Sequence, residues 1–330
     1  IIVLMSVLAR NRLFNINSDK EFEEMAIETY HYQNKFNPIY SKYSSLILEG
    51  KKPKNINEIP FLPIDFFKHE KIISKEKESQ IIFKSSGTTG TRSLHYIADL
   101  DLYEINFKKN FTSTYGEIKD TCIIGLLPSY QENGDSSLIY MVNTLIQESS
   151  NQYSGFYNND KKKLSRIINK QETENKKTII IGVTYALLDL AEKFPQPLKN
   201  TIIIETGGMK GKREELVKEQ VHAILMNAFE TKSIHSEYGM TELLSQAYSN
   251  GEGLFTPPKW MKIIIRDIND PLSILGINKT GAINIIDLSN VYSCSFIATQ
   301  DLGFKLDENN FKLSGRLSNA DIRGCNLLIG

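Results

Sequence analysis

The chain contains 330 residues, 41% of them hydrophobic, which is enough to bury a substantial core and to form about two or three subdomains. Its 39 basic and 39 acidic residues balance, which argues against a surface built for nucleic acid or for an anionic membrane. The N-terminal apolar stretch, residues 1–8, is far shorter than the roughly 20 residues of a membrane span. We therefore expect a cytoplasmic protein with no nucleic-acid partner and no membrane span.

The three cysteines give no sign of a disulfide framework or a zinc site. Cys122, Cys294 and Cys325 are widely spaced, odd in number and outside any CxxC or Cys/His pattern. Each is therefore interpreted as a free thiol. Cys122, which lies in an apolar run, and Cys294, which lies on a late predicted strand, are interpreted as packing residues.

The N-terminal segment, residues 1–60, is predicted to be helical. Ser18 and Glu21 form a capping-box pattern, and apolar residues follow at helical spacing. The segment ends in a cluster of lysine, proline and asparagine, residues 50–60, which is typical of a surface connection.

Residues 61–258 alternate short β-branched runs with helical ones. Strands are predicted at Ile81–Phe83, Thr121–Leu127, Thr178–Gly182 and Thr201–Glu205. Helices are predicted near Leu100–Tyr115, Ser136–Gln147, Val183–Phe194 and Arg213–Phe229. This alternation indicates an α/β nucleotide-binding core with a mostly parallel, helix-covered sheet.

After Trp260 the pattern changes to strands with few helices. The predicted strands are Met261–Arg266, Ala282–Leu288 and Val291–Ala298. We therefore expect residues 259–330 to form a smaller, β-rich subdomain.

A loop rich in glycine and hydroxyl residues follows the first strand of the core. It consists of Ser85, Ser86, Gly87, Thr88, Thr89 and Gly90. Glycines let backbone N–H groups approach an anion, and hydroxyls can donate to phosphate oxygens. The loop is not a Walker A sequence, because Gly90 is followed by Thr91 and Arg92. An ordinary turn remains the alternative interpretation.

The loop resembles the phosphate-binding loop of the adenylate-forming superfamily, which comprises acyl-CoA ligases, luciferases and peptide-synthetase adenylation domains. Four further segments are similar to motifs of that superfamily and occur in the same order: Glu205-Thr206-Gly207-Gly208, Tyr238-Gly239-Met240-Thr241-Glu242, Thr299-Gln300-Asp301-Leu302-Gly303, and Gly315-Arg316 with Ile322-Arg323-Gly324. Together the matches span about three quarters of the chain. The resemblance implies the large N-terminal domain of these enzymes.

The resemblance also implies roles for single residues around ATP and Mg²⁺. Glu242 would hold the Mg²⁺ that bridges the phosphates, since a hard cation prefers carboxylate oxygen, and Thr241 would contact the α-phosphate. Alone, Glu242 would be interpreted as a solvated surface carboxylate.

The nucleoside part of ATP has its own candidates. Gly207, Gly208, Tyr238 and Gly239 would lie at the adenine, while Asp301 would accept hydrogen bonds from the ribose hydroxyls. Arg316 would reach ribose or phosphate. The alternatives are a plain turn for the glycines and Asp301, a core tyrosine and a surface arginine.

The sequence departs from the pattern of the superfamily at the loop lysine. The usual Gly-x-Pro-Lys is replaced by Gly90-Thr91-Arg92-Ser93. Arg92, Lys84 and His95 are left as alternative sources of positive charge. A segment at 127–131, Leu-Pro-Ser-Tyr-Gln, falls where relatives line the acyl pocket.

The C-terminal end suggests an acyl acceptor within the chain. Typical relatives continue past the hinge into a mobile domain with a catalytic lysine, whereas this sequence ends at Gly330, so we expect that lid to be absent. Cys325 directly follows the hinge beside Arg323, which resembles the LuxE-type acyl-protein synthetases and, more loosely, phenylacetate-CoA ligases. By that resemblance, Cys325 takes the acyl group as a thioester; the alternative is a packing residue.

The predicted function is ATP-dependent activation of a carboxylic acid, fatty or aromatic, followed by acyl transfer to a thiol. The final acceptor would be a reductase or carrier protein reached through Cys325. One alternative is a partner-dependent ligase that acylates CoA or a carrier protein. The other is a nucleotide-binding assembly subunit that has lost catalysis, which the missing loop lysine favours.

Overall fold

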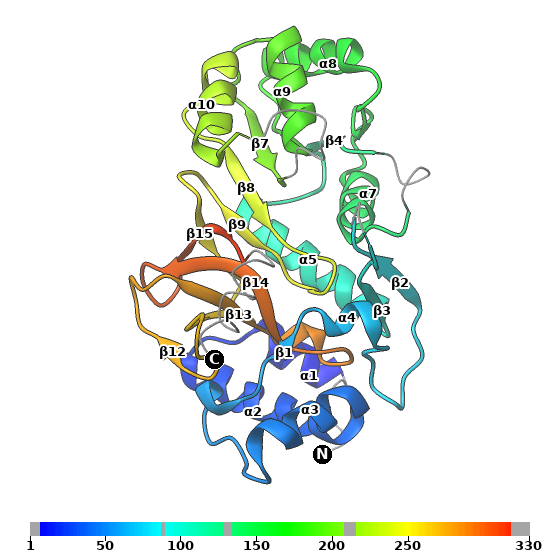
Figure 1. Cartoon of the computed structure of the whole chain (residues 1–330). Coiled ribbons are helices and arrows are strands. Elements are labelled where there is room, and N and C mark those ends of the chain that lie inside the picture. The colour runs from blue at the N-terminus through cyan, green and yellow to red at the C-terminus, as the bar shows by residue number, and fades with distance from the viewer. Residues whose placement is uncertain (1–6, 87–89, 129–133, 208–215, 318–330) are drawn as a thin grey trace. The chain divides into compact units, whose positions relative to one another are not determined.

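A computed structural model describes residues 7–86, 90–128, 134–207 and 216–317 (Figure 1). Several residues that carry sequence predictions lie outside these ranges: Gly87, Thr88, Thr89, Gly208 and Cys325, together with residues 129–131 of the acyl-pocket segment and 322–324 of the hinge motif. The chain divides into two compact units. Unit 1 contains residues 1–106, 240–245 and 256–330, and unit 2 contains residues 107–239 and 246–255.

The helices of unit 1 come from the N-terminal part of the chain: α1 (Val7–Phe14), α2 (Asp19–Phe36), α3 (Pro38–Leu48), the 3-10 helix η1 (Ile56–Glu58) and α4 (Phe66–His69). The Ser18 hydroxyl caps α2 by accepting from the backbone N–H of Glu21 at 3.2 Å, as its sequence pattern predicts. Within the described residues, no helix of the chain is long and apolar enough to cross a bilayer.

The main sheet of unit 1 is antiparallel and follows the order β12–β11–β13–β14–β15 (Figure 1). Its strands are β11 (Met261–Arg266), β12 (Ile274–Leu275), β13 (Gly281–Asp287), β14 (Phe296–Lys305) and β15 (Phe311–Arg316), and β1 (Leu62–Pro63) pairs parallel to β14. Strand β11 has the bounds that the sequence predicts, because its buried isoleucines give an unambiguous apolar run.

Two expectations about strands in this unit are wrong. The segment Val291–Ala298 is not one strand, since the 3-10 helix η2 (Leu288–Asn290) and a turn precede β14. The Gln33 side chain replaces strand pairing there: its Nε2 donates to the carbonyls of Asn290 and Val291, and its Oε1 accepts from the Ser295 N–H. The strand at Ile81–Phe83 belongs to a separate antiparallel hairpin of β2 (Ile81–Lys84) and β3 (Leu94–Ile97), not to the parallel sheet.

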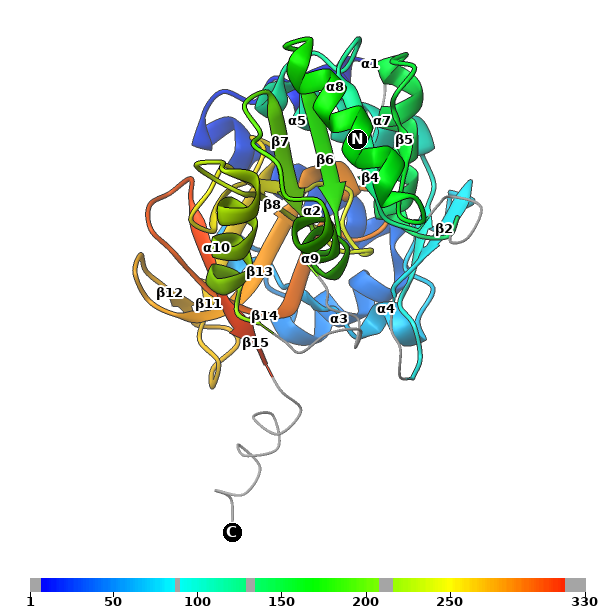
Figure 2. The ribbon, with the colours of Figure 1, turned by 90° about the horizontal axis from the view of Figure 1, so that it is seen from above.

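Unit 2 contains the predicted parallel sheet, in the order β5–β4–β6–β7–β8, with β9 antiparallel to β8. The strands are β4 (Cys122–Leu126), β5 (Gly155–Phe156), β6 (Thr178–Gly182), β7 (Thr201–Glu205), β8 (His235–Tyr238) and β9 (Ala247–Ser249). Figure 2 shows β7, β6 and β4 side by side. Every residue of β4 and β6 is buried, as expected of parallel strands covered on both faces.

The helices of unit 2 alternate with these strands: α7 (Ser137–Ser149), α8 (Lys161–Thr173), α9 (Thr184–Lys193) and α10 (Lys218–Phe229). Helix α5 (Leu100–Tyr115) and strand β10 (Leu254–Thr256) each contribute residues to both units. The α/β class predicted from the sequence is confirmed, while its division into residues 1–60, 61–258 and 259–330 stays a prediction.

Candidate active site

The glycine- and hydroxyl-rich loop connects β2 to β3 in unit 1. Ser85 and Ser93 close its base: the Ser85 N–H donates to the Ser93 carbonyl at 3.1 Å, and the Ser93 N–H donates to the Ser85 hydroxyl at 3.0 Å. Gly90 has a φ of +100°, which a residue with a side chain rarely adopts. Ser86, Thr91 and Arg92 are exposed, so this loop presents hydroxyls and one guanidinium to solvent.

Glu242 is buried in unit 1, with 5% of its surface exposed. Burial raises the pKa of its carboxyl group, and the nearby negative charge of Asp301 adds to that effect. A hydrogen bond from the Ser93 side chain and the positive charge of Arg316 oppose it and favour the carboxylate. Residues from four distant segments therefore share one electrostatic neighbourhood.

The backbone around Glu242 is held by two buried side chains. His95 Nδ1 lies 2.7 Å from the Thr241 carbonyl, and His95 Nε2 lies 3.0 Å from Asn290 Oδ1. Asn290 Nδ2 donates to the carbonyls of Glu242 at 2.8 Å and Cys294 at 2.9 Å. Burial lowers the pKa of His95 to about 4. His95 is thus a neutral support for the Thr241–Glu242 backbone, not a source of positive charge for the loop.

The segment Thr241–Ser245, which contains Glu242, is also held by a second buried network, around Asp287. One carboxylate oxygen accepts from the N–H groups of Leu244 at 2.8 Å and Ser245 at 2.9 Å, and the other accepts from the Ser245 hydroxyl at 2.7 Å. Asn106 Nδ2 donates to the Leu244 carbonyl at 2.6 Å, and Trp260 Nε1 donates to Asn106 Oδ1 at 2.6 Å. Because buried polar groups are costly when unpaired, this network specifies one conformation for the loop.

Asp301 and Arg316 lie side by side on the neighbouring strands β14 and β15 of unit 1. They are direct partners in the register of β14 and β15, and Arg316 Nε lies 3.7 Å from Asp301 Oδ1. The Thr299 hydroxyl accepts from the Asp301 N–H at 3.1 Å. The Arg316 side chain is 65% exposed and that of Asp301 19% exposed, so both can contact a bound molecule.

In unit 2, the predicted adenine turn is built on Glu205. Glu205 Oε1 accepts from the Gly207 N–H at 2.7 Å and from the Thr184 hydroxyl. Its Oε2 lies 3.5 Å from Lys218 Nζ and 3.9 Å from His222 Nε2. Burial alone would raise the pKa of Glu205, but these partners hold it at about 2. Glu205 is therefore an ionised anchor that fixes Gly207, whose φ is +76°.

Tyr238 and Gly239 lie at the end of β8 in the same unit. Tyr238 is buried and packs edge-on against Phe255, with ring centroids 5.9 Å apart. A Cβ on Gly239 would lie 2.2 Å from Glu237 Oε1, so only glycine fits there without moving that carboxyl. Burial, and then the negative charge of Glu205, raise the pKa of Glu237 to about 8.

The Mg²⁺ site predicted from the sequence is consistent with one feature of the structure, the single buried carboxylate of Glu242. The described residues contain no group of three or more His, Cys, Asp or Glu side chains that could hold a metal by themselves. Mg²⁺ is commonly bound through one or two carboxylates together with phosphates and water. Glu242 offers one buried carboxylate of this kind, and a dication beside it would offset the cost of its burial.

Three residues of this region are not identified by sequence reasoning as parts of the site: Ser93, Asn290 and Asp287. Ser93 falls where the motif of the superfamily has its lysine, so a pattern match passes over it as a departure. Asn290 and Asp287 belong to no motif. The remaining thiols of the described chain, Cys122 and Cys294, are buried, and burial raises the pKa of Cys122 to about 11 and of Cys294 to about 12.

No protein-family model matches the chain, and no curated protein sequence matches it. Solved structures do match its fold. ATP-bound MatB from Rhodopseudomonas palustris matches with a TM-score of 0.55 and 13% identity, over 71% of this chain and 47% of that chain. An open conformation of 2-hydroxyisobutyryl-CoA ligase, in complex with 2-HIB-AMP and CoA, matches with a TM-score of 0.65 and 12% identity, over 96% and 80%.

A luciferase-like enzyme from the nonluminescent mealworm Zophobas morio matches with a TM-score of 0.50 and 14% identity, over 82% of this chain and 61% of that chain. The fold is that of the adenylate-forming enzymes. The expectation drawn from the ordered motifs is thereby confirmed at the level of fold. The chain spans about half the length of the MatB chain that it matches.

Proposed function

We propose that this chain uses ATP and Mg²⁺ to activate a carboxylic acid as an acyl-adenylate. The observation that carries the proposal is the grouping of Ser93, Glu242, Asp301 and Arg316 in unit 1. The last three come from separate motifs, and Ser93 pairs with Ser85 at the base of the candidate phosphate loop. The proposal is further supported by the shared fold, since one neighbour is ATP-bound and another binds 2-HIB-AMP.

In the proposed reaction the protein positions the reactants and stabilises the negative charge of the phosphates. A carboxylate oxygen of the acid attacks the α-phosphorus of ATP, the new O–P bond forms, and pyrophosphate leaves with its electron pair. Because the acid is already ionised at neutral pH, no general base is required. Glu242 would hold Mg²⁺ at the phosphates, Thr241 would donate to the α-phosphate, and the β2–β3 loop would bind the phosphate tail.

The nucleoside contacts remain those of the sequence prediction. Asp301 would accept hydrogen bonds from the ribose hydroxyls, and Arg316, opposite it, would reach ribose or phosphate. Gly207 and Tyr238 of unit 2 would contact the adenine. The rigid support of Gly207 by Glu205 suits such a role, because a preordered turn loses less entropy on binding.

Acid-dependent exchange of labelled pyrophosphate into ATP tests this proposal. We expect exchange that requires Mg²⁺ and at least one member of a panel of aliphatic and aromatic acids. Absence of exchange with every acid would favour the alternative of a nucleotide-binding subunit without catalysis.

The acyl acceptor is proposed to be a thiol. The two candidates, Cys325 and CoA, can be distinguished by experiment. Transfer through Cys325 would make the chain an acyl-protein synthetase acting on a fatty acid. CoA is favoured by the likeness to a ligase solved with 2-HIB-AMP and CoA. Cys325→Ser should keep pyrophosphate exchange but lose a hydroxylamine-labile acyl label on the protein. A wild-type chain that never becomes labelled, yet releases acyl-CoA, would identify CoA as the acceptor.

A further inference from the structure

A large hollow in unit 1 is lined by a buried positive charge, Arg266, that the candidate active site does not use. The hollow measures 1190 Å³, compared with roughly 300–1,000 Å³ for common small-molecule pockets. Arg266, at the end of β11, lines it and is 9% exposed. Glu242, Asp301 and Arg316 are not among its lining residues.

Among the described residues, the hydrogen-bond partners of the Arg266 side chain are all neutral. Its Nη1 donates to the Ile283 carbonyl at 2.9 Å and to Asn284 Oδ1 at 2.7 Å, and its Nη2 donates to the Thr299 carbonyl at 2.7 Å. A guanidinium carries five N–H donors, so the Nε–H and one Nη2–H make none of these bonds. Burial lowers the pKa of Arg266 to about 10, which leaves it charged at neutral pH.

Two of the three acidic residues that line the hollow have partners elsewhere, and the third, Glu49, is exposed and forms no ion pair with Arg266 in the described part of the chain. Asp65 binds Lys68 at 2.5 Å and accepts from Gln300 at 2.8 Å. Glu58 accepts from the Lys54 N–H and from Asn55, both at 2.8 Å. Neither carboxylate forms an ion pair with Arg266 in the described part of the chain.

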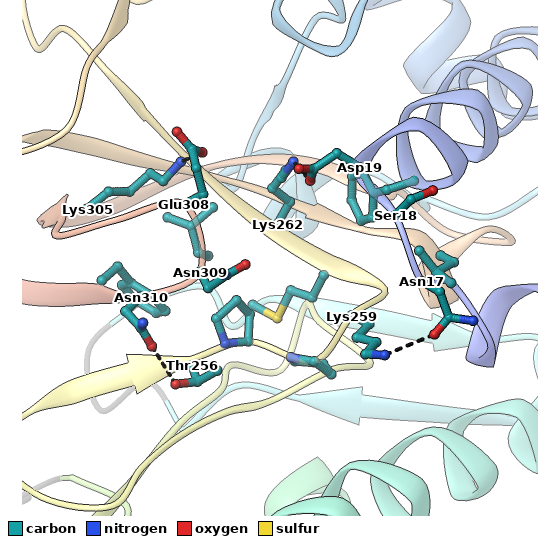
Figure 3. A pocket seen from close by; sticks show the side chains of 17 residues that line it. Asn17, Ser18, Asp19, Thr256, Lys259, Lys262, Lys305, Glu308, Asn309 and Asn310 are labelled. Carbon is teal, nitrogen blue, oxygen red and sulfur yellow. Dashed lines mark hydrogen bonds and ion pairs between the residues drawn. The ribbon is translucent and has the colours of Figure 1, made fainter.

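A neighbouring hollow of 540 Å³ in the same unit shows the usual arrangement of charge (Figure 3). There Lys262 pairs with Asp19 at 2.7 Å and Lys305 with Glu308 at 2.5 Å. Lys259 donates to Asn17 Oδ1 at 3.0 Å, as Figure 3 shows. The larger hollow differs because its deepest cation has no carboxylate partner among the described residues.

The rim of the larger hollow is apolar and exposed. Ile47 is 37% exposed, Ile268 42% and Leu272 67%, and all three line it. Below them lie buried apolar residues such as Ile59 and Phe61. An apolar wall with a few converging polar groups is typical of a small-molecule site, and exposed apolar side chains gathered at one place mark a surface that is covered in use.

We infer that this hollow binds an amphipathic anion, with a carboxylate or phosphate head at Arg266 and an aliphatic chain along the Ile47, Ile268 and Leu272 rim. Four basic side chains line the hollow, those of Arg266, Lys51, Lys52 and Lys54, against three acidic ones, so its lining carries a small excess of positive charge. The inference does not depend on adenylate chemistry.

Titration calorimetry of the full chain with dodecanoate, dodecyl phosphate and dodecanol, without ATP or Mg²⁺, tests the head group. Both anions should bind, and dodecanol should bind roughly tenfold to a hundredfold more weakly, since it lacks the charge that Arg266 meets. The two anions also distinguish a carboxylate head from a phosphate head. Equal affinity of dodecanol and dodecanoate would overturn the inference.

Two variants with matched exposure locate the chain of the ligand. Ile268 and Ile277 are both 42% exposed, but only Ile268 lines the hollow. Ile268→Gln should weaken dodecanoate binding roughly threefold to tenfold, whereas Ile277→Gln should leave it unchanged. Equal effects of the two substitutions would place the bound chain elsewhere and contradict the inference.

Arg266→Met removes the charge with a side chain of similar length. Dodecanoate affinity should fall to that of dodecanol, while dodecanol affinity stays the same. Arg266 also donates a hydrogen bond to the Ile283 carbonyl at the β13–β14 bulge, so its loss can destabilise the fold. The melting temperature of the variant is therefore measured together with its affinities. If this variant does not fold, the head-group series and the Ile268 and Ile277 pair still decide. Sedimentation that shows a dimer lost in Ile268→Gln, with no binding of either anion, would assign the hollow to a second copy of the chain and refute the inference.

Discussion

The Thr241–Ser245 loop of unit 1 and the Glu205–Gly207 turn of unit 2 each follow a strand, and both carry predicted nucleotide contacts. They are stabilised in different ways. The loop is held mainly by neutral buried groups of His95, Asn106 and Asn290, with the Asp287 carboxylate accepting from N–H and O–H donors. The turn is held by the Glu205 carboxylate, which lies near the Lys218 ammonium group and the His222 ring.

This difference predicts which changes should destabilise each region. Hydrogen bonds inside a dry network depend on every partner being present, so the loop should respond strongly to removal of a single acceptor. An ion pair depends on protonation and is screened by salt, so the turn should respond to acid and to ionic strength.

The largest effect on stability is expected for Asp287→Ala. Loss of its carboxylate leaves the N–H groups of Leu244 and Ser245 without their buried acceptor, and we expect a loss of about 3 kcal/mol or more in the free energy of unfolding. Chemical denaturation measures it.

Asp307→Ala is the matched control for that change. Asp307 accepts from the N–H groups of Asn309 and Asn310 in an exposed turn, where water can replace it. Its substitution should cost much less. Similar losses for Asp287→Ala and Asp307→Ala would mean that the buried network does not stabilise the loop.

A smaller effect is expected for Glu205→Gln, and it should depend on pH. The folded pKa of Glu205 is about 2, below its ordinary value of 4.5, so its contribution is fully present above pH 4.5 and is lost as the pH falls toward 2. The wild type should exceed the variant by about 2 kcal/mol near pH 6, after allowance for solvent screening at the partly exposed Lys218. The difference should shrink below pH 4.5. A constant difference from pH 6 to pH 3 would contradict the ionised anchor.

A pH dependence of the opposite sign is expected for Glu237→Gln. The folded pKa of Glu237 is raised to about 8, so the stability it contributes is full below pH 4.5 and is lost as the pH rises through 8. The neutral amide removes that titration. Because one pKa unit corresponds to about 1.4 kcal/mol, we expect wild-type stability to fall relative to the variant by roughly 3 kcal/mol between pH 5 and pH 8. Parallel stability curves over this range would show that Glu237 is not kept protonated by burial.

The fold could be predicted from the sequence where burial leaves a clear pattern. Strands β6 and β7 have the predicted bounds, because runs of isoleucine, fully buried in β6 and mostly buried in β7, are flanked by polar residues. The partner of β2 could not be predicted, since pairing depends on β3, a short strand with no strong apolar run. The turn before β14 was missed because it is held by Gln33, which is distant in sequence.

The sequence names candidate site residues through their motifs, but it does not show which residues support them. Thr241, Glu242, Asp301 and Arg316 are marked by ordered motifs. His95 was recognised as a charge candidate, yet its actual partner is the Thr241 carbonyl, 146 residues away. A single sequence does not show such pairings, because each partner is an ordinary polar residue in its own segment.

Pyrophosphate exchange by Glu242→Gln tests the central claim most directly, because it removes the carboxylate proposed to hold Mg²⁺ while keeping its shape. The exchange rate is measured over a range of Mg²⁺ concentrations, with Glu308→Gln, a carboxylate paired with Lys305 in the same unit, as the control. We expect Glu242→Gln to lose roughly a hundredfold or more in kcat/KM, and Glu308→Gln to match the wild type. An unchanged rate and Mg²⁺ dependence in Glu242→Gln, with a normally folded protein, would contradict the account.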